Sequence, residues 1–137
     1  MLDQIDMAIL NCLQKNGRMQ WREIGELVHL SGQAVGGRIR KLEEMGVIEG
    51  YTVRLNHSKL DAAITALVTI FIKSTDHASF QAFIKPHPAI IEAHRISGEG
   101  CYLLKVSVAD QEALNKLLDE ILHYGNYRVN LSINQIK

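Results

Sequence analysis

Residues 29–42 of this 137-residue chain read HLSGQAVGGRIRKL, and this stretch decides the fold of the first half. Ser31 is a favourable N-cap, because its hydroxyl can accept a hydrogen bond from the first turn of a following helix. Apolar residues then recur at the spacing of one helix face: Val35, Ile39 and Leu42. The charged residues between Ser31 and Leu42 are all basic: Arg38, Arg40 and Lys41. The segment therefore predicts a turn followed by a helix with a buried stripe and a basic stripe.

Two further helices are predicted before this one. The first begins after its N-cap Asp3 and ends at Asn16-Gly17. The second spans Trp21 to Val28 and is expected to bury three residues: Ile24, Leu27 and Val28. The third helix runs from Ser31 to about Met45 and stops before Gly46. A helix, a short helix, a tight turn and a longer helix with a basic face is the order of a helix-turn-helix DNA-binding motif.

After Gly46 the apolar period changes to two, so residues 47–55 are expected to be extended and to make the first domain a winged helix-turn-helix. The expected domain is 1–55, followed by a polar hinge at 56–61 and a second domain at 62–137. The second domain has the predicted order βαββαβ, with the elements near 64–72, 76–84, 90–97, 101–108, 110–125 and 128–133. The fold class is therefore α+β, with an N-terminal helix-turn-helix domain joined to a C-terminal ferredoxin-like domain.

Composition excludes several other classes of protein. There are 15 Lys and Arg against 15 Asp and Glu, so basic character can only be local. Neither an export signal nor an apolar run of about 18 residues is present, which indicates a cytoplasmic protein without a membrane partner. Cys12 and Cys101 lie far apart and the histidines are scattered, so no disulfide, metal site or cofactor is expected. No catalytic arrangement of residues is recognised.

The residues that follow carry a resemblance to a known family. They are Leu2-Asp3-Gln4-Ile5-Asp6, Gly17-Arg18, Glu23-Ile24-Gly25, Leu30-Ser31, Arg38-Ile39, Leu42-Glu43, Gly46 to Thr52, Arg95 to Gly98 and Tyr102 to Val106. In this order and spacing the chain resembles the Lrp/AsnC family of leucine-responsive and related feast/famine transcription regulators. The resemblance covers essentially the whole chain. It implies double-stranded DNA as a partner, a ligand-sensing and oligomerisation domain, and a nucleoid-associated protein.

Candidate DNA-binding residues lie on or near the third predicted helix. Gln33 and Arg40 can pair with adenine and guanine in the major groove, whereas Arg38 and Lys41 suit phosphates. Gly36 and Gly37 either permit close backbone approach to DNA or are tolerated weaknesses of the helix. Arg18 either holds a phosphate or interacts with a local carboxylate. The full candidate set is Arg18, Ser31, Gln33, Gly36, Gly37, Arg38, Arg40 and Lys41.

The resemblance also implies a candidate effector loop, formed by Gly98, Glu99, Gly100, Cys101 and Tyr102. In the family this loop helps to hold a free amino acid between subunits, and an Asp is usual where this chain has Cys101. A thiol is a poorer partner for an ammonium group than a carboxylate, so leucine is expected to bind weakly here unless Glu99 supplies the charge. The alternative is that the glycines only form a tight hairpin turn.

One face of the predicted sheet lacks covering helices and carries Leu67, Phe71, Ile96 and Leu103. A second copy would cover it, so a homodimer is expected, as such or assembled further into a tetramer or an octamer of dimers. The leading hypothesis is a sequence-specific transcription regulator modulated by a small amino-acid effector. The alternatives are an architectural DNA-wrapping protein without an effector response and, less favoured, an amino-acid-binding metabolic enzyme subunit.

Overall fold

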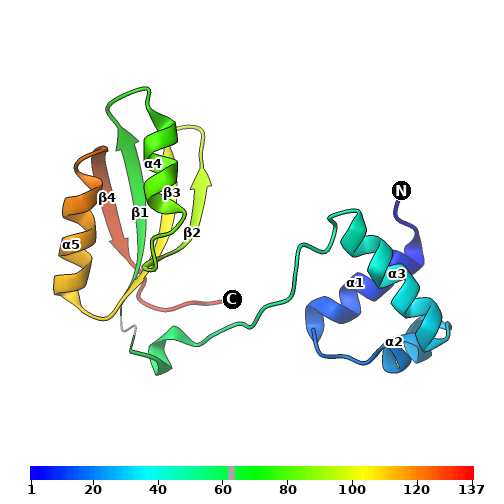
Figure 1. The fold of residues 1–137 in the computed structure, drawn as a ribbon. Helices are drawn as coiled ribbons and strands as arrows, with labels where there is room; N and C mark the ends of the chain where they lie inside the picture. The colour runs from blue at the N-terminus through cyan, green and yellow to red at the C-terminus, as the bar shows by residue number, and fades with distance from the viewer. Residues whose placement is uncertain (62–63) are drawn as a thin grey trace. The chain divides into compact units, whose positions relative to one another are not determined.

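The computed structural model describes residues 1–61 and 64–137, which form two compact units, Met1–Arg54 and Leu55–Lys137 (Figure 1). Each unit has its own hydrophobic core. The predicted start of the second domain at residue 62 lies outside the described residues.

The first unit contains three helices, α1 (Gln4–Lys15), α2 (Trp21–Val28) and α3 (Gly32–Glu44). Asp3 caps α1 in a capping box, in which its carboxylate accepts from the Asp6 N–H and the Asp6 carboxylate accepts from the Asp3 N–H. Ser31 caps α3 by accepting a hydrogen bond from the Ala34 N–H at 3.1 Å. Both predicted N-caps are confirmed, and the helix-turn-helix order is confirmed with them.

The turn between α2 and α3 is made by His29, whose backbone is left-handed with φ 59°. The core beneath it consists of Ile9, Ile24, Val35 and Ile39, one or two residues from each helix. Leu27 is an exception to the prediction, because its side chain is 63% exposed instead of buried. The inward face of a helix as short as α2 is narrow, so sequence spacing alone placed Leu27 on the wrong side.

The strand predicted at 47–55 is wrong. In the described part of the chain these residues pair with no strand, and no wing is formed. Val47 and Ile48 instead donate their N–H groups to the Leu42 carbonyl at the end of α3. An alternating pattern gives an extended backbone, but a strand also requires a partner to bond its edges.

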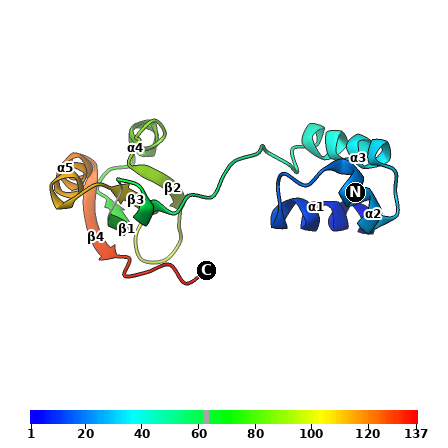
Figure 2. The same cartoon turned by 90° about the horizontal axis from the view of Figure 1, so that it is seen from below.

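The second unit contains β1 (Ile64–Ile72), α4 (His77–Ile84), β2 (Ile90–Arg95), β3 (Tyr102–Val108), α5 (Gln111–Ile121) and β4 (Gly125–Leu131). In the segment predicted as a hinge, residues His57–Lys59 form one 3-10 turn, which belongs to the second unit. The sheet has the order β2-β3-β1-β4 and is antiparallel throughout, which confirms the predicted βαββαβ ferredoxin-like fold. Both helices cover the same face of this sheet (Figure 2).

Successive side chains of a strand point to opposite faces of the sheet, and this alternation decides which residues the helices bury. Ala66, Val68 and Ile70 of β1 pack with Phe80 of α4 and with the apolar face of α5. The intervening side chains point to the sheet face without helices. Leu67 is 40% exposed there, and Arg128 lies over the ring of Phe71. The predicted split between a covered and an uncovered face is thus present in the structure.

Candidate nucleic-acid interface and effector loop

The exposed face of α3 carries four of the predicted DNA-binding residues: Gln33, Gly37, Arg40 and Lys41. Val35, Ile39 and Leu42 hold the opposite face of the helix in the core. Across residues 1–61 and 64–137, no carboxylate lies within ion-pair distance of Arg40 or Lys41. Their charges are therefore available to an external anion.

Arg38 has a different environment from the other cations of α3, since it is paired within the unit. Its Nη1 donates to Asp3 Oδ2 at 2.6 Å and to Asp6 Oδ1 at 3.0 Å. The hydrogen bond from Arg38 is the main reason that the pKa of Asp3 is lowered, and the same bond raises the pKa of Arg38. Two carboxylates thus balance this guanidinium, and Arg38 fastens α3 to the start of α1.

The two adjacent glycines of α3 occupy different environments. Gly36 is buried and faces α2, where an added Cβ would lie 2.3–2.4 Å from ring carbons of Trp21. This corrects the expectation that Gly36 faces DNA, because its small size makes room for an indole of the same unit. Gly37 is exposed, and a Cβ there would meet nothing within 4 Å. Only Gly37 keeps the backbone open on the outer face of α3.

Trp21 links α2 to this face and was not among the predicted site residues. Its side chain is 43% exposed, and the guanidinium carbon of Arg40 lies 5.6 Å from the ring centroid. This is a cation–π geometry. The lone tryptophan at a helix start gave no periodic signal, and its partner Arg40 lies on another helix.

Arg18 lies in the exposed connection between α1 and α2. Its backbone N–H donates to the Asn16 Oδ1 at 3.0 Å, which fixes the turn. In the described residues its side chain forms no ion pair, so the local carboxylate considered from sequence is not found.

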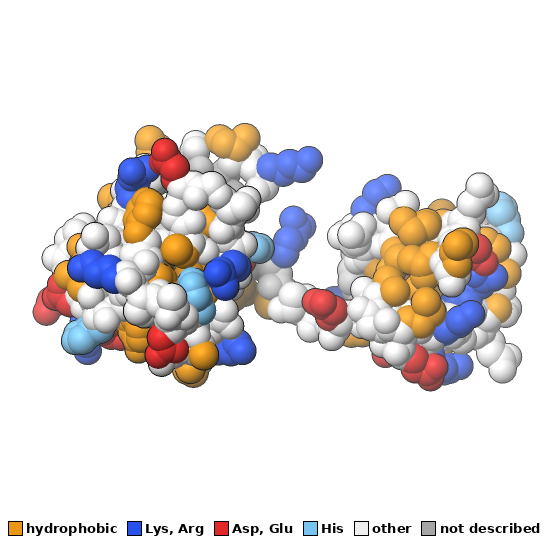
Figure 3. All heavy atoms as spheres, turned by 90° about the horizontal axis from the view of Figure 1, so that it is seen from above, with side chains coloured by type: hydrophobic (Ala, Val, Ile, Leu, Met, Phe, Trp, Pro, Cys, Tyr) orange, Lys and Arg blue, Asp and Glu red, His pale blue; other side chains and the backbone are white. Residues whose placement is uncertain are grey.

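On each of the two units drawn in Figure 3, side chains of both charges are visible. This agrees with the zero net charge of the sequence. Between Ser31 and Leu42 the charged residues are all basic, so α3 carries a local excess of positive charge before Glu43.

The candidate effector loop joins β2 to β3, and the backbone conformation of this loop explains why two of its residues are glycines. Gly98 and Gly100 have φ values of 91° and 92°, in the left-handed region that favours glycine. A Cβ on Gly100 would lie 2.5 Å from Thr69 Cγ2. Cys101 donates its N–H to the Ile70 carbonyl at 2.7 Å and accepts from the Ile96 N–H at 3.0 Å. The loop is therefore anchored to β1.

Glu99 is the one carboxylate of this loop, and its side chain is 86% exposed. Its Oε2 lies 3.7 Å from Arg128 Nη1, so an arginine partly balances it. Cys101 is half-buried and packs against the core of the second unit. Both of its backbone groups already form hydrogen bonds within the unit.

The side chain of Tyr102 points away from the other residues of the predicted effector loop. Its side chain is 3% exposed and lies beneath α4, against the edge of Phe80. Its hydroxyl accepts a hydrogen bond from Gln81 Nε2 at 3.1 Å and lies 2.9 Å from His77 Nδ1. The guanidinium of Arg95 lies 5.6 Å from the ring centroid of Tyr102.

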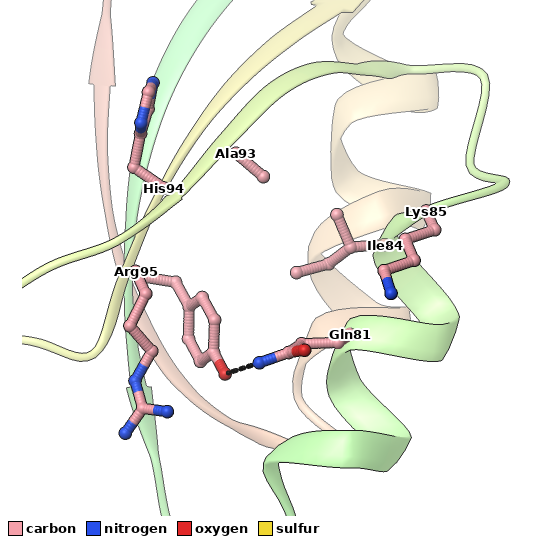
Figure 4. A pocket seen from close by; sticks show the side chains of 7 residues that line it. Gln81, Ile84, Lys85, Ala93, His94 and Arg95 are labelled. Carbon is pink, nitrogen blue, oxygen red and sulfur yellow. Dashed lines mark hydrogen bonds between the residues drawn. The ribbon is translucent and has the colours of Figure 1, made fainter. Parts of the chain in front are cut away.

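A hollow of about 260 Å³ lies between α4 and β2 above this tyrosine (Figure 4). Its lining residues are Gln81, Ile84, Lys85, Ala93, His94, Arg95 and Tyr102. In the part of the chain that the structure describes, no group of three or more His, Cys, Asp or Glu residues is arranged to hold a metal ion. No helix formed by the described residues is long and apolar enough to cross a membrane.

Comparison with known proteins gives matches over both units. The AsnC-type helix-turn-helix domain matches residues 2–43, and the Lrp/AsnC ligand binding domain matches residues 65–137. The HTH-type transcriptional regulator LrpB of Bacillus subtilis (strain 168) is 48% identical over 136 residues, which are 99% of this chain and 91% of that protein.

Two solved structures have the same fold over the full chain. The structure of LrpC from B. subtilis has a TM-score of 0.93 at 31% identity and covers 100% of this chain and 98% of its own. A transcriptional regulator from Neisseria meningitidis in complex with L-Met has a TM-score of 0.91 at 28% identity. The match covers 100% of this chain and 93% of that chain.

These relatives are named as regulators, which sets aside the alternative of an enzyme subunit. The ligand-binding domain alone matches more than half of the chain, and the relative at 48% identity is matched over nearly its full length. This chain therefore belongs to the Lrp/AsnC family and is a DNA-binding transcription regulator.

Proposed function

We propose that the protein binds DNA as a homodimer through the exposed face of α3 and responds to a small free amino acid through its second unit. The observation that carries the first part is the environment of Arg40 and Lys41, which extend from the outer side of α3 without a carboxylate partner among the described residues. An unpaired cation can release counterions from DNA, whereas one that is already paired contributes little.

Base readout is assigned to Gln33 and Arg40. The amide of Gln33 can form two hydrogen bonds with the edge of an adenine. The guanidinium of Arg40 can form two hydrogen bonds with O6 and N7 of a guanine. Both side chains are exposed on α3, one near its start and one two turns later. The open surface at Gly37 lies between them in sequence and allows the helix to approach the groove closely.

Backbone contact is assigned to Lys41 and Arg18. An ammonium group is a point charge that suits a phosphate without specifying a base. Ser31 supports the interface by capping α3, and its role is to hold the helix start. Arg38 is left out of the interface, because Asp3 and Asp6 hold its guanidinium.

Dimerisation is assigned to the sheet face without helices. Leu67 is exposed on this face at the centre of β1, opposite Lys105 of β3. This face also carries Phe71, Ile96 and Leu103, which are half-buried in the single chain. A second copy presents the same surface in return, as a two-fold interface requires.

The amino-acid response is assigned to the β2–β3 loop. The solved complex of the N. meningitidis regulator contains L-Met, and the second unit of this chain matches a ligand-binding domain. Glu99 is the exposed carboxylate that could pair with the ammonium of a free amino acid, in place of its present partner Arg128. Because Cys101 brings no charge, we expect free leucine to bind weakly.

Fluorescence anisotropy on labelled DNA from upstream of the protein's own gene tests this proposal. Affinity should fall steeply with salt, with a log–log slope of about −0.9 for each phosphate contacted. Footprinting should protect two half-sites about 34 Å apart, or a multiple of this spacing, since two copies of α3 must enter successive major grooves. Binding that is indifferent to salt, or a single short protected site, would contradict the proposal.

A further inference from the structure

We infer that Trp21 is a positioning residue for DNA recognition: its indole holds the Arg40 guanidinium in the orientation that reads a base, and Gly36 is glycine because that indole occupies the space beside it. The inference rests on the base contact assigned to Arg40 under the proposed function. It adds a residue of α2 to the recognition surface of α3.

The backbone of α3 at Gly36 lies directly against the indole of Trp21. An added Cβ at Gly36 would lie 2.3 and 2.4 Å from two ring carbons and 3.0 Å from a third. Real Cβ atoms essentially never come this close, so any larger residue would displace the ring. A glycine in the middle of a helix also lowers helix stability relative to alanine. The close seating of an aromatic ring is a specific reason to keep glycine here.

The same indole also contacts Arg40. The guanidinium carbon lies 5.6 Å from the ring centroid, within the range of an attractive cation–π contact. In residues 1–61 and 64–137 no acidic side chain forms an ion pair with Arg40. The side-chain partner of its guanidinium in these residues is the indole of Trp21. Trp21 thus contacts both the backbone of α3 at Gly36 and the guanidinium of Arg40.

Stacking leaves the recognition chemistry of Arg40 free. In the part of the chain that the structure describes, the guanidinium of Arg40 donates no hydrogen bond to another side chain, so the contact with the indole does not use up its N–H donors. Those donors can still pair with guanine O6 and N7. An arginine that is held in one place before binding loses less side-chain freedom when it meets the base. The indole therefore improves recognition without touching DNA itself.

Arg38 provides the contrast on the same helix. Its guanidinium is held by two carboxylates, which occupy its donors and balance its charge. An ion pair would orient Arg40 just as well but would compete with the base. An aromatic partner orients a cation without neutralising it.

The first test needs no DNA, because Trp21 is the single tryptophan of the chain and its fluorescence reports on this site alone. Arg40→Ala should change the emission maximum or quenching of Trp21 in the free protein. Lys41→Ala, a loss of charge at the next residue, is the matched control and should leave the emission unchanged. Equal spectra for wild type and Arg40→Ala would overturn the stacking.

The second test is a double-mutant cycle on DNA discrimination. The ratio of affinities is measured between the preferred site and a site with a substituted base, for wild type, Trp21→Leu, Arg40→Ala and the double variant. Trp21→Leu should lower this ratio about two- to fivefold, as expected for loss of an exposed cation–π contact. In the Arg40→Ala background it should have no further effect. Trp21→Phe keeps an aromatic face and should retain part of the ratio.

The outcomes separate the inference from the proposal beneath it. If Arg40→Ala leaves the ratio unchanged, the proposed base contact fails, while the fluorescence test still decides on the stacking. If Arg40→Ala lowers the ratio and Trp21→Leu lowers affinity for all sequences alike in both backgrounds, Trp21 is only structural and the inference is overturned. Circular dichroism of each variant checks the helix content, and Trp21→Phe serves the cycle where Trp21→Leu fails to fold.

Discussion

Truncation of Leu42 should destabilise the DNA-binding unit far more than the same truncation at Leu27. Leu42 lies on the buried face of α3 and is 1% exposed. Leu27 lies on α2 and is 63% exposed, although its position in the sequence suggested burial. The two Leu→Ala variants remove the same atoms from the same unit, so any difference between them comes from packing.

The expected magnitude is large for a unit of this size. Replacing a buried leucine with alanine destabilises proteins by about 2–5 kcal/mol, from the lost transfer free energy and the cavity left behind. A surface truncation typically changes stability by about 0.5 kcal/mol or less. Domains are stable by about 0.05–0.15 kcal/mol per residue, so the unit Met1–Arg54 should have only about 3–8 kcal/mol in total. Leu42→Ala should therefore remove a large part of it.

Urea denaturation followed by Trp21 fluorescence measures this directly, since the single tryptophan lies in the first unit. The midpoint should fall strongly for Leu42→Ala and barely for Leu27→Ala, with an unchanged slope for both. All proteins must be compared at one concentration, because dimerisation adds a concentration-dependent term to stability. Equal shifts for the two variants, or a loss below about 1 kcal/mol for Leu42→Ala, would refute the assigned core.

Three further predictions address single contacts. Asp3→Asn should cost the most stability above the ordinary aspartate pKa of about 3.9, where the stabilisation from Arg38 is fully present. Because the pKa of Asp3 is lowered in the folded protein, this stabilisation declines as pH falls from the ordinary value through the lowered one. Melting curves of the variant and wild type should therefore converge in stronger acid, and a persistent gap there would contradict the ion pair. Ser31→Ala should cost about 1 kcal/mol by removing the α3 cap, whereas Ser31→Asn should retain most of it in the same urea titration. Cys101→Asp should strengthen amino-acid binding by about 1.5–3 kcal/mol in calorimetry, and a lower melting temperature without any gain in binding would show that Cys101 only packs.

Much of the fold could be predicted because it follows from local physics. Asp3 and Ser31 cap helices through hydrogen bonds to backbone groups only three residues away. Alternation along β1 decides which side chains the helices cover, and no distant information is needed for it. The expected strand at 47–55 failed because pairing depends on a partner that the pattern of one segment does not specify.

The site could be predicted only in part, because three of its features depend on tertiary contacts. Arg38 was grouped with the other cations of α3, yet its partner Asp3 lies 35 residues earlier. From the sequence, Gly36 was expected to be exposed beside Gly37. The packing of α2 against α3 places the Trp21 ring next to it, and this contact cannot be inferred from the sequence of α3 alone. The side chain of Tyr102 follows the buried alternation of β3 and so leaves the loop that its sequence neighbours form.

The most direct test of the central claim is a base-preference profile, obtained by selection from random DNA with wild type and single variants at α3. Arg40→Ala should lose preference at one position in each half-site and keep the rest of the profile. Lys41→Ala should keep the whole profile, bind all sequences more weakly and show a salt slope reduced by about 1. Arg38→Ala, after correction for stability, should keep both profile and slope. If Arg40→Ala and Gln33→Ala leave the profile unchanged, the outer face of α3 does not read the bases and the account is wrong.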